Sequence, residues 1–164
     1  MNSIIEGRVW KFGDNISTDL MYPGTVMHGK VPHNERKWGC MSANRPEFAR
    51  SVQPNDIVVA GKNFGCGSSR PANELLMDLQ VGCVLADSFA AIFFRNCISG
   101  GLPSIELEYI GDMFSDGDTA RVDLNEGLIQ NRTTGKTCSF IPYPKEIVDI
   151  LMAGGVIEYI KNEA

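Results

Sequence analysis

Residues 56–87, DIVVAGKNFGCGSSRPANELLMDLQVGCVLAD, decide the fold of this 164-residue chain. Two short apolar runs, DIVVAG and GCVLAD, predict buried strands, and PANELLMDLQ between them places Leu75, Leu76 and Leu79 on one helical face. Pro71 is well suited to the first helical position. A strand–helix–strand unit requires a right-handed crossover between parallel strands. The stretch therefore predicts an α/β protein with a largely parallel sheet.

The sequence upstream of this unit predicts one strand and then loops. IIEGRVW, residues 4–10, alternates loosely and predicts the first strand. Residues 12–24, FGDNISTDLMYPG, are rich in turn formers and predict a loop. Residues 25–49 show poor periodicity, and a long irregular segment inside a domain is typically a functional or mobile loop.

Downstream, the pattern continues with a helix, a strand and a meander. Ser88 is placed to cap a helix, SFAAIFFRNCISG, that Gly100 and Gly101 end. Three of its apolar residues are expected in the core: Phe89, Ile92 and Phe93. PSIELEYI predicts a strand, and ARVDL, LIQNR and KTCSFI predict further strands before a last helix, PKEIVDILMAG. We expect one domain over residues 1–164, with a mostly parallel central sheet or barrel and an antiparallel C-terminal meander.

Composition narrows the class of protein. The chain is 43% hydrophobic and 21% charged, as in an ordinary soluble globular protein. Its net charge of −5, without a Lys/Arg run, argues against nucleic acid as a partner. No apolar run reaches the roughly 18 residues of a membrane span, and the N-terminus lacks the layout of a secretory signal. We therefore expect a cytoplasmic protein with no membrane partner.

The cysteines do not predict a disulfide framework or a metal site. No Cys-x-x-Cys pair exists, and only His28 and His33 could add imidazole ligands. Cys83 is expected to behave as a small buried hydrophobe. Cys66, inside the glycine-rich stretch, is interpreted as a compact side chain in a crowded turn rather than a reactive thiol.

The glycine-rich turn GKNFGCGSSRPANE, residues 61–74, concentrates the polar chemistry. It matches neither a P-loop, nor a dinucleotide fingerprint, nor a nucleophile elbow. It does bring Ser68, Ser69 and Arg70 to a predicted helix N-terminus, where unpaired N–H groups favour anions. Arg70 can bind a carboxylate through two hydrogen bonds. Local physics leaves two interpretations open, a structural turn with capping hydroxyls or an anion site.

Three motifs in the same order resemble those of a known family. NFGCGSSR, LADSFAAIFFRNCISGGLP and the upstream GDNISTDLMYPG together resemble the small subunits of the aconitase superfamily, above all those of the 3-isopropylmalate dehydratases. The resemblance implies a swivelling β/β/α domain that docks on a separate large subunit. In the family that large subunit carries a [4Fe-4S] cluster acting as a Lewis acid. The implied reaction moves a hydroxyl between adjacent carbons of a 2-hydroxy di- or tricarboxylate.

The resemblance also implies roles for individual residues. Ser68 matches the family's serine base, which removes the proton alpha to a carboxylate. Ser69 is expected to hydrogen-bond the substrate, and Arg70 to bind one of its carboxylates. Asp19 matches an aspartate that orients the active site, although in isolation it is also a typical loop Asx-turn residue. Asn96 is interpreted as structural, making hydrogen bonds at a helix end.

Two departures from the family pattern concern substrate choice. Glu-His-Ala commonly follows the Ser-Ser-Arg triplet, whereas this chain has Pro71, Ala72 and Asn73. The loop of residues 25–49, which corresponds to the family's specificity loop, is unlike the expected short versions. It supplies candidate contacts to the distal group of the substrate: His28, Lys30, Arg36 and Lys37.

The leading interpretation is thus the small subunit of an iron–sulfur hydro-lyase acting on a 2-alkylmalate such as isopropylmalate. A sibling dehydratase for dimethylmalate, methylmalate or homoaconitate is the nearest alternative. A non-catalytic carboxylate-binding module is the alternative from another class.

Overall fold

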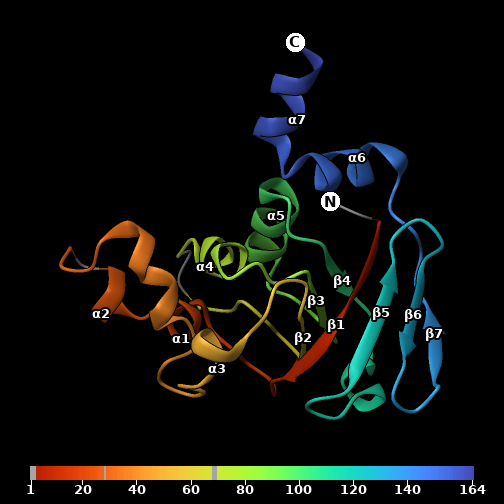
Figure 1. Ribbon diagram of the computed structural model, residues 1–164, viewed down its shortest axis with the longest axis horizontal. Helices are drawn as coiled ribbons and strands as arrows, with labels where there is room; N and C mark the ends of the chain where they lie inside the picture. Colours follow the sequence, from red (N-terminus) through yellow and green to blue (C-terminus); the bar gives the residue numbers. More distant parts are fainter. Residues whose placement is uncertain (1–2, 28, 68–69) are drawn as a thin grey trace.

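The computed structural model describes residues 3–27, 29–67 and 70–164 (Figure 1). Its framework is a seven-stranded sheet in the order β4-β3-β2-β1-β5-β6-β7. The parallel half comprises β1 (Ile4–Lys11), β2 (Ile57–Ala60), β3 (Cys83–Ala86) and β4 (Ser104–Glu106). The antiparallel half comprises β5 (Thr119–Asp123), β6 (Leu128–Asn131) and β7 (Thr137–Ser139). The expected α/β class, with a parallel sheet and an antiparallel C-terminal meander, is confirmed.

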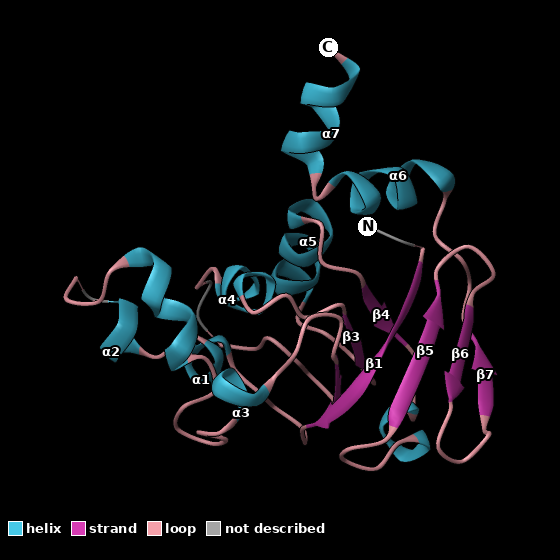
Figure 2. Ribbon diagram, viewed as in Figure 1, coloured by secondary structure: helices cyan, strands magenta, loops and turns pink. Residues whose placement is uncertain are grey.

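Strand β1 joins the two halves. Its C-terminal end pairs with β2 in parallel, with Val9 opposite Ile57. Its N-terminal part pairs with β5 in the antiparallel sense, with Ile4 opposite Asp123. Figure 2 shows the meander on one side of β1 and most helices grouped on the other. In α/β proteins, ligands usually bind at the loops that follow the carboxyl ends of the parallel strands.

Helices pack over the parallel strands and at the C-terminus. The crossover helices are α4 (Ala72–Asp78) and α5 (Ala91–Gly100), and the chain ends with α6 (Lys145–Ala153) and α7 (Val156–Glu163). Short helical segments fill the connections: α1 (Thr18–Met21), α2 (Gly24–Met27), η1 (His33–Gly39), α3 (Phe48–Ser51) and η2 (Ile110–Met113). In the part of the chain that the structure covers, no helix is both long and apolar enough to cross a membrane.

The central strands β2 and β3 are buried on both faces, as their continuous apolar sequences require. Val58 and Ala60 of β2 face one core, which is closed by α3, α4 and α5. Ile57 and Val59 alternate to the other face, where the second core includes Leu151 of α6 and the inner side chains of the meander. The glycine-rich turn follows directly after β2. Because β2 is packed between the two cores, the first residue of the turn is held in place from both faces of the sheet.

Several local expectations were wrong. Residues 12–24 are not all loop, because Ser17 caps the one-turn helix α1 by accepting a hydrogen bond from the Leu20 N–H. Ser88 does not cap α5, which begins at Ala91. The Ser88 hydroxyl instead accepts a hydrogen bond from the Asn63 backbone N–H at 2.8 Å. The hydroxyl therefore serves a neighbouring loop and not its own helix.

Other helix and strand boundaries also differ from the predicted ones. Pro71 precedes α4 and is not its first helical residue. The strand expected over residues 103–110 is only β4, after which the chain turns into η2. The terminal VIEYIKN, for which no element was predicted, lies in α7. The end of α5 was predicted correctly, since Gly101 adopts the left-handed conformation that closes the helix.

Candidate active site

Three loops from the carboxyl ends of β1, β2 and β3 lie side by side. The glycine-rich loop after β2 is the middle one. On one side the Gly65 N–H donates to the Ile16 carbonyl, and the Thr18 N–H donates to the Cys66 carbonyl, both at 2.8 Å. On the other side the Phe64 N–H donates to the Ser88 carbonyl at 3.0 Å. The loops thus continue the order of the parallel strands and bring the three sequence motifs together.

Two glycines allow this close approach. A Cβ atom at Gly61 would lie 1.9 Å from the Asp14 carboxylate, which accepts the Lys62 N–H at 2.7 Å. Gly65 has φ +82°, and a Cβ there would lie 2.2 Å from the ring of Phe93 on α5. Glycine is therefore required at both positions because a neighbouring group occupies the space of a side chain.

A pocket of about 270 Å³ opens where these loops meet α5. Its volume is near the lower end of the range for small-molecule sites. Its lining residues come from all three loops and from the first turns of α5: Thr18, Gly65, Gly67, Arg70, Ala90, Ala91, Ile92, Phe93 and Asn96. The pocket combines one guanidinium with a largely apolar wall.

Arg70 is held at this pocket by the short helix α1. Its Nε lies 3.0 Å from Oδ1 of Asp19, and its Nη1 donates to the Tyr22 carbonyl at 2.8 Å. The Arg70 side chain is 22% exposed and that of Asp19 is 53% exposed. Ion pairs this accessible contribute little to stability, about 1 kcal/mol or less. The main consequence of the two contacts is a fixed orientation of the guanidinium.

Two backbone N–H groups at the start of α4 are hydrogen-bonded within the chain. The Ala72 N–H donates to the Arg70 carbonyl at 2.7 Å, and the Glu74 N–H donates to the Pro71 carbonyl at 3.1 Å. The buried Asn73 side chain donates to the Asn96 carbonyl at 3.1 Å and so ties α4 to α5. Among the described residues that line the pocket, Arg70 is the one with a charged side chain.

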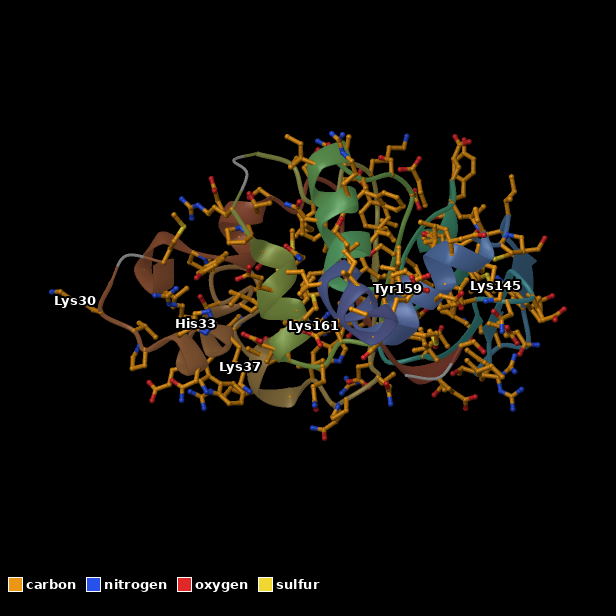
Figure 3. All side chains as sticks on the ribbon, turned by 90° about the horizontal axis from the view of Figure 1, so that it is seen from above. Lys30, His33, Lys37, Lys145, Tyr159 and Lys161 are labelled. Atoms are coloured by element: carbon orange, nitrogen blue, oxygen red, sulfur yellow. The ribbon has the colours of Figure 1, made fainter. Side chains whose placement is uncertain are left out.

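The other predicted site residues fall into two groups. Ser68, Ser69 and His28 lie outside the described residues. Lys30 is described, is exposed and does not line the pocket. Figure 3 shows it pointing away from the molecule at the outer end of its loop. The structure thus brings Asp19 and Arg70 together but does not bring Lys30 to them.

Two pocket residues were missed by the sequence interpretation. Ile92 was expected in the core and is 55% exposed, whereas Phe93 is buried as predicted. Asn96 was expected at a helix end and lies inside α5 on the pocket. Their spacing of four residues places them on one helical face, while Phe93 and Cys97 form the buried face. That spacing was a signal available in the sequence.

The buried thiols of Cys40, Cys83 and Cys97 are not poised for metal binding or nucleophilic attack. All five cysteines are free, and burial raises the pKa of Cys40 and Cys83 far above its ordinary value. Burial also raises the pKa of Cys97 to about 12, against the opposing effect of a hydrogen bond with Ser104. Within residues 3–27, 29–67 and 70–164, no group of three or more His, Cys, Asp or Glu side chains could hold a metal ion.

Comparisons with known proteins agree with the arrangement of the motifs. The Aconitase C-terminal domain family matches residues 15–109. The 3-isopropylmalate dehydratase small subunit 1 of Thermotoga maritima is 46% identical over 97% of this chain and 96% of its own. The isopropylmalate/citramalate isomerase small subunit of Methanocaldococcus jannaschii is 43% identical over 99% of this chain and 97% of its own.

A solved structure is similar over almost the whole fold. The crystal structure of a 3-isopropylmalate dehydratase from Methanocaldococcus jannaschii superposes with a TM-score of 0.88 at 37% identity. The match covers 98% of this chain and 95% of the other. The sheet order and the loops that form the pocket therefore belong to a fold already seen in an experimental structure.

Proposed function

Because the chain belongs to the family of 3-isopropylmalate dehydratase small subunits, we propose that it is the small subunit of a two-chain hydro-lyase. Its partner is a large subunit, as the names of the relatives imply. The proposed substrate is a 2-hydroxy dicarboxylate, with isopropylmalate first among the candidates. Its hydroxyl moves between adjacent carbons by loss and re-addition of water, a reaction of leucine biosynthesis.

The observation that carries this proposal is the position of Arg70. Its guanidinium lines a small pocket and is oriented by Asp19 and by the Tyr22 carbonyl. A guanidinium binds a carboxylate with two parallel hydrogen bonds, and prior orientation reduces the entropy lost on binding. Arg70 is accordingly proposed to bind a substrate carboxylate, with Asp19 as the residue that positions it.

We assign the base to Ser68, and Ser69 to hydrogen bonds with the substrate. Both stand in the sequence between Gly67 and Arg70, two residues that line the pocket. The deprotonated Ser68 side chain takes up the proton alpha to the carboxylate and becomes a hydroxyl, and the positive charge of Arg70 favours the deprotonated form beforehand. The same group returns the proton when water is added back.

Contacts to the distal group are proposed for His28 and Lys30. In the isolated chain Lys30 lies away from the pocket, so its participation requires its loop to move when the large subunit and substrate bind. A comparison of Lys30→Ala with the parent complex, by KM for the substrate, tests this part separately from the base.

The metal chemistry is assigned to the partner. A [4Fe-4S] cluster on the large subunit supplies, when bound, the Lewis acid that polarises the departing hydroxyl. The described residues of this chain do not fit a cluster, since they offer no group of three suitable ligands and their buried thiols resist ionisation. The proposed mechanism therefore does not use a cluster bound by the described residues of this chain.

Reconstitution with the large subunit tests the proposal. The complex is expected to form an unsaturated dicarboxylate from isopropylmalate, measured by its absorbance, and the isolated chain is expected to form none. Ser68→Ala should abolish turnover, whereas Ser42→Ala, at an exposed serine outside the pocket, should not change it. Near-normal turnover by Ser68→Ala contradicts the assignment of the base. Carboxylate binding without any turnover would favour a binding module instead.

A further inference from the structure

Helix α5 packs against the core through one face and presents an apolar side chain to the pocket from another. Phe93 and Cys97 form its buried face. Ile92 is 55% exposed and lines the pocket together with Ala90 and Ala91. An exposed isoleucine alone is ordinary. Three adjacent apolar residues on the wall of a small pocket instead form a surface that an apolar ligand group can cover.

The same pocket also has polar lining residues. Arg70 supplies a positive charge, and Thr18 and Asn96 are polar. A ligand that fills the pocket is therefore expected to combine an anionic group with an apolar group. A carboxylate with a nearby branched alkyl substituent has this combination, and a citrate-like acid with a third carboxylate does not.

The position of Ile92 relative to Arg70 is fixed by close packing. The neighbouring Phe93 touches the backbone of Gly65 so closely that even a methyl group would not fit between them. The Phe93 ring also packs edge-on against Phe64 at 5.5 Å between centroids. The first turn of α5 is thus anchored to the glycine-rich loop that leads to Arg70, and the apolar wall keeps its place when a ligand enters.

We infer that Ile92 is a specificity-determining residue that contacts the alkyl substituent of the substrate. The inference rests on the proposed function and extends it, because it identifies which part of the substrate this chain distinguishes. Shortening Ile92 removes apolar contact from a large substituent and hardly any from a small one. Loss of one or more methylene-sized contacts in an apolar pocket typically changes selectivity by about 10-fold or more.

The test compares Ile92→Ala with the parent chain in the complex with the large subunit. The kcat/KM values are measured for 2-isopropylmalate and for 2-methylmalate. Ile92→Ala should lower the ratio of the isopropyl to the methyl value by about 10-fold. Ile157→Ala is the matched control, because Ile157 is 70% exposed on α7, which projects away from the loops (Figure 1). The control should leave the ratio unchanged, and both variants should keep the parent Tm.

Each other outcome overturns the inference. An unchanged ratio in Ile92→Ala means that the alkyl group lies elsewhere. An equal fall for both substrates, together with weaker binding of the large subunit, means that Ile92 is a subunit contact. A parent complex that converts neither acid refutes the proposed function itself, and the inference falls with it.

Discussion

Replacing Gly65 by alanine tests how the glycine-rich loop is held. The added methyl group would lie 2.2 Å from Cγ of Phe93, which is inside the contact distance of two carbon atoms. The ring cannot move easily, because it is buried among the aromatic side chains of Phe64 and Phe89. The backbone at Gly65 also has φ +82°, a conformation that an alanine adopts only with strain.

The expected loss of stability has two parts. The left-handed conformation costs an alanine about 1 to 2 kcal/mol. Forcing a methyl group into a packed aromatic contact costs about 1 to 3 kcal/mol more. The sum, roughly 2 to 5 kcal/mol, is a large part of the roughly 5 to 15 kcal/mol by which such a domain is stable.

The chain contains a control for the first part. Gly135 has φ +81°, and a Cβ there would meet no atom within 4 Å among those described. Gly135→Ala should therefore show only the conformational cost, and any effect of alanine on the unfolded chain is shared by both variants. The difference between the two free energies of unfolding, measured in urea, then reports the contact with Phe93.

The reasoning is refuted if Gly65→Ala and Gly135→Ala lose the same free energy of unfolding within about 0.5 kcal/mol, the usual size of such errors. A second readout is turnover in the complex. Gly65→Ala should lower kcat because the displaced loop leads to Ser68, the proposed base. Gly135→Ala, in the turn between β6 and β7, should leave kcat unchanged.

Three further predictions concern charged residues. Arg70→Lys should raise the KM for the dicarboxylate about 10-fold or more, because lysine cannot form the paired hydrogen bonds, and a KM within twofold of the parent contradicts the assigned contact. Asp19→Asn should also raise KM, with little change in Tm, since the pair with Arg70 is accessible to solvent. Hydrogen bonds from Arg45 lower the pKa of Asp116 below its ordinary 3.8, so the carboxylate stabilises the fold above that pH and loses this effect as the pH falls through its lowered value. Asp116→Asn should thus cost up to about 1 kcal/mol at pH 7, and urea unfolding should show the difference from the parent vanishing in acid.

The framework of the sheet could be predicted because its signals are local. Within DIVVAG and GCVLAD, the strand residues IVVA and CVLA are apolar at every position, and a strand buried on both faces is recognised by such a run. The paired turn signals of the meander are equally local. By contrast, α1 has four residues, and its single turn is held by contacts with Arg70, which lies far along the chain. Propensity alone is too weak to predict so short a helix.

The errors at the site also arise from contacts between residues that are far apart in the sequence. Ser88 has the ideal chemistry of a helix cap, but its hydroxyl satisfies the backbone of the adjacent loop at Asn63. Ile92 looks like a core residue because isoleucine usually is one, and only the position of the pocket shows otherwise. In each case a partner distant in sequence decided the outcome between two locally reasonable alternatives.

The unusual Pro71-Ala72-Asn73 segment lies outside the lining of the pocket. None of these three residues is among the described residues that line the pocket. Ala72, the first residue of α4, is buried in the core, and the Asn73 side chain donates to the Asn96 carbonyl of α5. The departure from Glu-His-Ala therefore changes the support between two helices and not the guanidinium or the apolar wall. Because those two features are the ones proposed to select a carboxylate and its substituent, the sequence departure argues for altered positioning of α5 and leaves the proposed type of reaction intact.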